Sequence, residues 1–197
     1  MRRLLWGLMT VLAVAIAAYA LAAVFLPSFG APFIAERRAT MPLALYAHLV
    51  GGGVALGLGP WQFARGLRAR ALGVHRWLGR GYVAAVLAGG LGGLVMATRS
   101  EEGLVTHVGF GLLAVVWLAS TTMAFVKIRR RDRAAHQIWM IRSFALTLAA
   151  VTLRIYIPLS QAAGIPFPEA YQVISWLCWV PNLVVAEWLV VPRAAPA

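Results

Sequence analysis

Four histidines are the residues of this chain whose type and spacing could do chemistry. Each stands at or just inside the start of a different long apolar run, and no histidine lies elsewhere: His48, His75, His107 and His136. A lone histidine near a helix end is usually an interfacial polar group or an interhelical hydrogen bonder. Imidazole is also a ligand of haem iron, and helix bundles often hold cofactors between facing helices. Recurrence at four successive helix starts favours ligation of a cofactor.

The direction of the apolar runs sorts the histidines by depth. Short links predict antiparallel neighbours, so His48 and His107 should lie near one membrane face, and His75 and His136 near the other. At 1.5 Å rise per residue the two levels are roughly 20 Å apart, in a core about 30 Å thick. Two separated pairs suit two haems better than zinc or copper, because a tetrahedral site needs its ligands at one place. No C-x-x-C-H motif is present, which excludes covalent haem attachment, so two haems held here would be non-covalent.

Glycine lies four residues after three of the histidines, at Gly52, Gly79 and Gly111. Residues i and i+4 share a helix face, so these glycines would clear space for a flat porphyrin beside the backbone. Small residues also mediate ordinary helix packing in lipid, and that explanation stays open.

Two arginines, Arg142 and Arg154, lie inside the fifth apolar run. A charged residue within a membrane span normally needs a partner. Among six acidic residues only Glu187 lies within a run, so the protein's own acids are poor candidates. Haem propionates are natural partners, because guanidinium binds carboxylate in a fork. We expect Arg142 to serve the inner haem and Arg154 the outer one, with snorkelling to lipid headgroups as the alternative.

The elements that would position these residues are membrane-spanning helices. Of 197 residues, 61% are hydrophobic and 12% charged, which is too apolar for a soluble domain. Six runs are long enough to cross a bilayer: 4–26 (ending at Pro27), 43–63, 77–97, 104–126, 137–157 and 171–191. We predict an all-α six-transmembrane helical bundle forming a single integral membrane domain, 1–197. Its first transmembrane helix occupies 1–27, a four-helix haem-binding core (helices 2–5) occupies 43–157, and the last helix, 171–191, is kinked by Pro181. The competing interpretation of the first run is a signal peptide cleaved after "AYA" at 18–20.

The basic residues orient the bundle. A cytoplasmic N-terminus puts thirteen of them on the inner side, at positions 2–3, 65–80, 127–133 and 193, and leaves Arg37, Arg38 and Arg99 outside. The net charge of +12 is therefore a topology signal, and we expect no nucleic-acid partner. We predict a multi-pass protein of a bacterial inner (cytoplasmic) membrane. Cys178 stands alone, which excludes an intramolecular disulfide.

Two stretches carry a resemblance to a known family: "HRWLGRGY" at 75–82 and "HQIWMIRSFALTLAAVTLRIY" at 136–156. Residues 48–157 resemble a bacterial membrane family, the domain-of-unknown-function family numbered 2306, which supplies no activity. The arrangement is also similar to the cytochrome b-561 group of two-haem membrane cytochromes. That second resemblance implies an outer haem held by His48 and His107 and electron transfer across the membrane. It implies an inner haem held by His75 and His136.

The leading hypothesis is a di-haem b-type cytochrome that moves electrons between a quinol or other reductant and an acceptor on the opposite face. Besides the lipid bilayer, a quinone, a redox partner protein and a second copy of the chain could be its partners. The sequence leaves open whether the chain is itself a membrane oxidoreductase. The alternatives are a proton-coupled membrane transporter and a cofactor-free structural membrane subunit.

Overall fold

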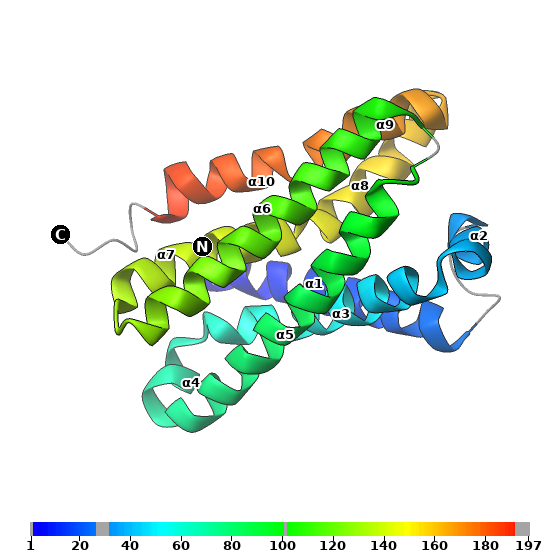
Figure 1. The fold of residues 1–197 in the computed structure, drawn as a ribbon. Helices are drawn as coiled ribbons and strands as arrows, with labels where there is room; N and C mark the ends of the chain where they lie inside the picture. Colours follow the sequence, from blue (N-terminus) through cyan, green and yellow to red (C-terminus); the bar gives the residue numbers. More distant parts are fainter. Residues whose placement is uncertain (1, 27–31, 101, 192–197) are drawn as a thin grey trace. The chain divides into compact units, whose positions relative to one another are not determined.

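The protein is helical throughout the part that the computed structural model describes, residues 2–26, 32–100 and 102–191 (Figure 1). Six segments are long and apolar enough to cross a membrane: Leu4–Phe25, Pro42–Gln62, Leu72–Ala97, Leu104–Arg129, Arg133–Ala162 and Phe167–Val190. They confirm the all-α prediction with its six spans, although the third, fifth and sixth begin earlier than expected. Pro27, where the first span was expected to end, and Arg193 lie outside the described residues.

The chain divides into two compact units, Met1–Gly92 and Gly93–Ala197, called unit 1 and unit 2 below. Unit 1 contains four helices and most of a fifth: α1 (Arg2–Phe25), α2 (Pro32–Thr40), α3 (Pro42–Gln62), α4 (Arg65–Arg70) and α5 (Leu72–Ala97). Unit 2 contains the end of α5 and the later elements: α6 (Leu104–Arg129), α7 (Arg133–Thr147), α8 (Ala149–Ala162), α9 (Phe167–Leu177), α10 (Val180–Val185) and the π-helical turn η1 (Ala186–Val190). The single membrane domain, 1–197, stays a prediction.

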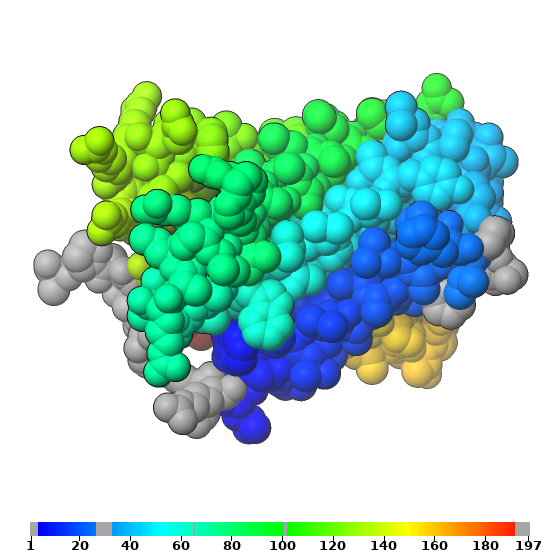
Figure 2. Space-filling view, turned by 90° about the horizontal axis from the view of Figure 1, so that it is seen from below, coloured from blue at the N-terminus to red at the C-terminus, as the bar shows by residue number. Residues whose placement is uncertain are grey.

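In unit 1, α1 packs along α3 through small residues (Figure 2). The buried face of α1 is a stripe at helical spacing: Ala13, Ala17, Ala20 and Ala23. On α3 the facing residue is Gly53, where an added Cβ would lie 3.2 Å from the Leu21 side chain. Trp6 and Trp61 meet edge to face at 6.4 Å, which places the start of α1 beside the end of α3. The two helices are therefore antiparallel, and their small residues allow the close approach that favours helix association in lipid.

A second close contact joins α3 to α5. A Cβ built on Gly51 would lie 2.4 Å from the Gly89 backbone nitrogen and 2.5 Å from the Ala85 carbonyl oxygen. The two backbones touch at this crossing, and only glycine fits there. Unit 1 thus has a rigid crossing between the two helices that carry its histidines.

The short helix α2 lies between the first two spans, and an arginine explains its place. Arg38 donates a hydrogen bond of 2.6 Å from Nη2 to the Ala23 carbonyl oxygen, and its guanidinium lies over the Tyr46 ring at 5.8 Å. The last carbonyls of a helix have no intrahelical donor, so a guanidinium there satisfies one of them and complements the helix dipole. This long-range contact holds α2 at the end of α1, and no local pattern in the sequence predicts it.

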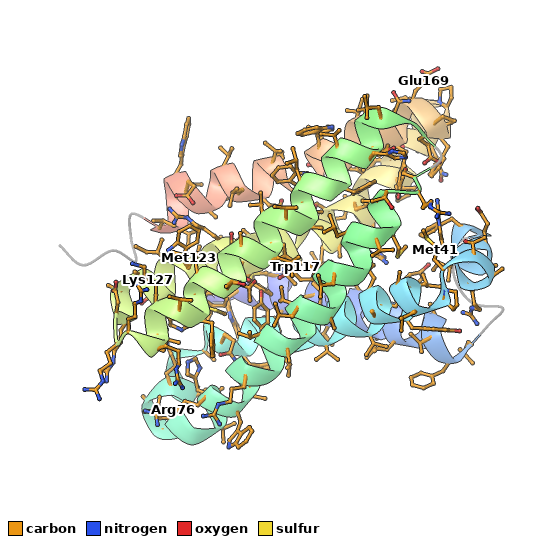
Figure 3. The ribbon with its side chains drawn as sticks, in the orientation of Figure 1. Met41, Arg76, Trp117, Met123, Lys127 and Glu169 are labelled. Atoms are coloured by element: carbon orange, nitrogen blue, oxygen red, sulfur yellow. The ribbon has the colours of Figure 1, made fainter. Side chains whose placement is uncertain are left out.

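In unit 2, buried hydroxyl groups bind α6 to α7. Trp117, midway along α6 (Figure 3), donates from Nε1 to Thr147 Oγ1 at 2.9 Å. Thr121 and Ser143, both fully buried, share a hydrogen bond of 2.7 Å between their hydroxyl groups. Interhelical hydrogen bonds of this kind hold membrane helices together where no hydrophobic driving force acts between them.

The last two spans are each broken near their middle. The sixth breaks at Cys178–Trp179, and Pro181 lies in the first turn of α10. This confirms the interruption predicted from Pro181, because proline fits a first helical turn better than a helix interior. The fifth span breaks at Leu148, between α7 and α8, which the sequence did not predict. The only proline in that span, Pro158, lies inside α8 and away from the break.

Asn182 bridges the two broken spans. Its Nδ2 donates to the carbonyl oxygens of Ala145 at 3.3 Å and Cys178 at 3.0 Å, and lies 3.2 Å from Thr152 Oγ1. The Thr152 hydroxyl in turn donates to the Cys178 carbonyl. Backbone groups released by a helix break are tolerated at membrane depth when side chains satisfy them in this way.

Candidate cofactor-binding site

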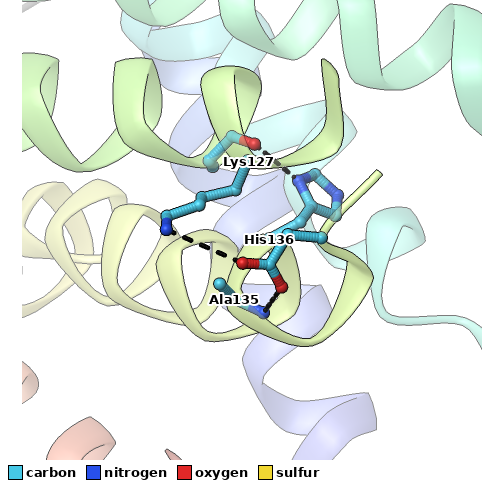
Figure 4. A network of polar contacts seen from close by, with 5 residues as sticks. Lys127, Ala135 and His136 are labelled. Carbon is cyan, nitrogen blue, oxygen red and sulfur yellow. Dashed lines mark hydrogen bonds and ion pairs between the residues drawn. The ribbon is translucent and has the colours of Figure 1, made fainter. Parts of the chain in front are cut away.

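His136 is held by the tight turn between α6 and α7. Arg131 takes a left-handed conformation (φ 63°), and the Asp132 amide donates to the Lys127 carbonyl at 3.0 Å, which ends α6. Asp132 then caps α7 by accepting from the Ala135 amide at 3.0 Å, and it pairs with Lys127 at 3.6 Å (Figure 4). The turn sets His136 in the first turn of α7, facing α6.

The His136 ring is anchored across the helix pair. Its Nδ1 lies 2.9 Å from the carbonyl oxygen of Ala124 on α6, and the ring is half-buried (Figure 4). A carbonyl can only accept, so Nδ1 carries the proton and donates. This fixes the tautomer in which Nε2 has the lone pair, the form in which histidine binds a metal.

His48 is anchored in the same manner in unit 1. Its Nδ1 donates to the carbonyl oxygen of Gly89 on α5 at 2.9 Å. Gly92, one turn beyond Gly89 on α5, also lets the two helices come close together. A Cβ on Gly92 would lie 2.5 Å from the Ala44 carbonyl oxygen and 2.8 Å from the His48 backbone nitrogen. The anchored nitrogen is again Nδ1, so Nε2 of His48 is the nitrogen suited to a metal.

His107 is held in the opposite sense. Its Nε2 lies close to the Ser100 carbonyl oxygen, in the turn before α6. The same turn is tied by hydrogen bonds of 2.8 Å from Ser100 to Thr106 and from Thr106 to the Gly103 carbonyl. To bind a metal, His107 must either coordinate through Nδ1 or exchange its bond to Ser100 for one to the metal. Three of the four histidines thus have an observed carbonyl partner, and two of them have the geometry expected of a ligand.

His75 lies in the first turn of α5 and is half-buried. Each expected pair takes one histidine from unit 1 and one from unit 2, so the pairing itself stays a prediction. Within residues 2–26, 32–100 and 102–191, no group of three or more His, Cys, Asp or Glu side chains could hold a metal ion.

The three glycines predicted to line a cofactor have different surroundings. Among the described residues, no atom lies within 4 Å of a Cβ built on Gly52 or on Gly111. At Gly79 the built Cβ would lie 3.2 Å from Oε1 of Gln62. The tight contact between α3 and α5 is made by Gly51 and Gly89, and a Cβ on Gly89 would also lie 2.8 Å from the Gly52 backbone nitrogen, so Gly52 borders this contact while its own Cβ direction stays open.

Arg142 pairs with Glu187, although the sequence favoured a haem propionate as its partner. Its guanidinium makes a fork to Glu187, with Nε 2.5 Å from Oε1 and Nη2 3.1 Å from Oε2. The same guanidinium lies over the Trp139 ring at 4.4 Å. The inference that the protein's acids are poor partners for Arg142 is therefore wrong. Its role toward a haem propionate stays a prediction.

Glu187 reaches Arg142 from the wide π-helical turn η1, and no local signal in the sequence marks that turn. Arg154, the other arginine of the fifth span, donates from Nη1 to the Ala150 carbonyl of its own helix at 2.9 Å. Its predicted service to an outer haem is untested.

Comparison with known families identifies the family of this chain. Residues 45–190 match the family described as predicted membrane protein, DUF2306. The chain belongs to DUF2306. The match runs from α3 to the end of η1, and it includes the four histidines, Arg142 and Glu187. It confirms the first family resemblance and extends it beyond 48–157. No curated protein and no solved structure matches the chain.

Proposed function

We propose that this DUF2306 protein is a di-haem b-type cytochrome that carries electrons across a membrane. The reductant would be a quinol or another donor, and the acceptor would lie on the opposite face. The observation that carries the proposal is the anchoring of His48 and His136. Each ring donates from Nδ1 to a backbone carbonyl of a neighbouring helix, which is the outer-shell contact that metal-binding histidines almost always make.

The ligands follow the helix order. His48 and His107 would hold the outer haem, and His75 and His136 the inner one. The bound haem would supply reversible one-electron chemistry at iron, and the chain would supply placement and electrostatics. His107 meets this role only after its ring leaves Ser100 or binds through Nδ1. The open Cβ directions at Gly52 and Gly111 suit a flat ring lying against α3 and α6.

The surroundings of the site follow from charge. Basic residues concentrate in the turns at one end of the spans, which supports a cytoplasmic N-terminus in a bacterial inner membrane. Because Arg142 already pairs with Glu187, it would tune an inner haem through its field and leave propionate binding to other groups. Arg154 would face the outer haem.

The test is a reduced-minus-oxidised optical spectrum of the purified protein, with a haem-to-protein ratio. We expect b-type bands and two haems per chain. Replacing His136 by alanine should remove about half of the absorbance, while alanine at the neighbouring Gln137 should keep all of it. The other histidines should behave as His136 does. Wild-type absorbance retained in all four histidine variants, or a colourless protein after expression with added haem, would overturn the proposal.

One observation favours a second candidate, a proton-coupled transporter. The last two spans are both broken, Asn182 links them, and an ion pair between Arg142 and Glu187 lies within the same spans. Broken helices and intramembrane charges mark substrate sites in many transporters. A colourless preparation that moves a solute or protons in sealed vesicles, and loses this activity on Glu187→Gln, would support it.

A further inference from the structure

Gln62 is a buried polar residue of unit 1, and the amide nitrogen of its side chain has no partner among the described residues. It is the last residue of α3 and only 5% of its surface is exposed. Its Nε2 is buried and has no hydrogen-bond partner among the described residues. Most buried polar groups in proteins are hydrogen-bonded, so an exception calls for a missing water or ligand. In a membrane span the cost of such a donor is higher still, because lipid offers no substitute.

The amide of Gln62 lies against the face of α5 that begins with His75. Oε1 is 3.2 Å from the position of a Cβ on Gly79, so the Gln62 amide lies in close contact with this part of α5. Gly79 is one turn beyond His75, and the stripe continues through Tyr82 and Val86, which are fully buried. The glycine and the histidine therefore share one face of α5, and the amide of Gln62 on α3 lies against that face at Gly79.

The character of the donor indicates the class of ligand. A primary amide is neutral, and apolar residues surround this end of α3: Pro60 is buried, and Leu58 reaches Gly81 on α5. The nearest described cation along α5, Arg80, turns its guanidinium onto the exposed Trp77 ring at 4.7 Å. A carboxylate beside Gln62 would be a poorly compensated charge, whereas a neutral carbonyl oxygen would accept the free N–H without that penalty.

We propose that Gln62 donates a hydrogen bond from Nε2 to a carbonyl oxygen of a quinone bound against Gly79 in unit 1. This inference rests on the proposed function, since it names the class of lipid-soluble redox partner that would exchange electrons near His75. Because Gln62 ends α3, its side chain can rotate to meet the ring without unwinding a helical turn. A leucine or methionine of similar size would serve ordinary packing at this position and would leave no unsatisfied polar group.

The test compares Gln62→Leu with wild type and with Gln161→Leu, the same change at an exposed position near the end of α8. Decylubiquinone is titrated into the purified full-length protein while tryptophan fluorescence quenching is followed, and the control variant, which keeps Gln62, should bind as wild type does. We expect Gln62→Leu to bind about three- to tenfold more weakly, the worth of one hydrogen bond. In the absence of quinone it should melt about 2–6 °C higher, because the unsatisfied donor is gone.

Each other outcome counts against the inference. Equal affinity in Gln62→Leu and wild type, or no saturable quenching in wild type, overturns it. Should Gln62→Leu fail to fold, Gln62→Met replaces it, and unchanged affinity there is equally decisive. A two-haem spectrum with quinone affinity independent of Gln62 overturns this inference alone. A colourless protein whose quinone affinity depends on Gln62 overturns the cytochrome proposal alone.

Discussion

The fork between Arg142 and Glu187 should be a measurable part of the stability of unit 2. Replacing Glu187 by glutamine keeps its size but removes its charge, and it leaves one of the two oxygens as a neutral acceptor. Hydrogen bonds to charged groups contribute about 1.5–3 kcal/mol each. The two side chains are 26% and 35% exposed, so solvent and headgroups weaken the interaction. We therefore expect a total loss of about 1–3 kcal/mol, or a melting temperature about 3–8 °C lower for a chain of this size.

Thermal unfolding in detergent, followed by circular dichroism, measures this loss. The matched control is Glu169→Gln, because Glu169 is an exposed acid in the first turn of α9. A double-mutant cycle with Arg142→Met isolates the pair from other effects of each substitution. The double variant should be more stable than the sum of the single losses predicts, because neither charge is then left alone. A melting temperature for Glu187→Gln within about 1 °C of wild type, or purely additive losses in the cycle, would refute the reasoning.

Two further predictions each concern a local contact, one in unit 1 and one in unit 2. Gly51→Ala should lower the melting temperature by about 2–10 °C, since its Cβ would lie 2.4 Å from the Gly89 nitrogen, whereas Gly52→Ala, with no atom within 4 Å among the described residues, should not. Equal melting of the two variants would contradict the helix crossing. Asp132→Ala should lower the free energy of unfolding by about 1 kcal/mol, because the cap on the Ala135 amide is lost. Asp132→Asn should retain most of this stability, because asparagine is also a good cap. Indistinguishable unfolding curves for these two would show that the cap is unimportant.

The spans could be predicted because their signal is local. Apolar runs of about 20 residues and short links fix the number and rough position of membrane helices without any knowledge of packing. Pro181 also acts locally, and the break before α10 was anticipated from it. The break at Leu148 has no such signal. It depends on Asn182 and Thr152, which satisfy backbone groups from another part of the chain.

The same distinction between local signals and long-range contacts applies to the candidate site. The histidines could be found by type and spacing, but the nitrogen that each uses depends on distant carbonyls, such as Gly89 for His48. Glu187 was set aside because its distance from Arg142 in sequence hides their contact. Gln62 looked like an ordinary polar residue at a span end, and only its burial without a partner makes it notable. Long-range contacts therefore decide what residue type alone leaves open.

The ion pair between Arg142 and Glu187 depends on the number of residues in the π-helical turn that carries Glu187. A π turn holds one residue more than the α turn it replaces. Each residue of a regular helix rotates the next by about 100°, so removing one residue just before Glu187 would swing its carboxylate away from Arg142. Relatives in DUF2306 whose sixth span is a regular α-helix should then carry their acidic residue at a neighbouring position. An alignment that matches residues column by column would score such proteins as lacking the acid, although the ion pair would be preserved in space.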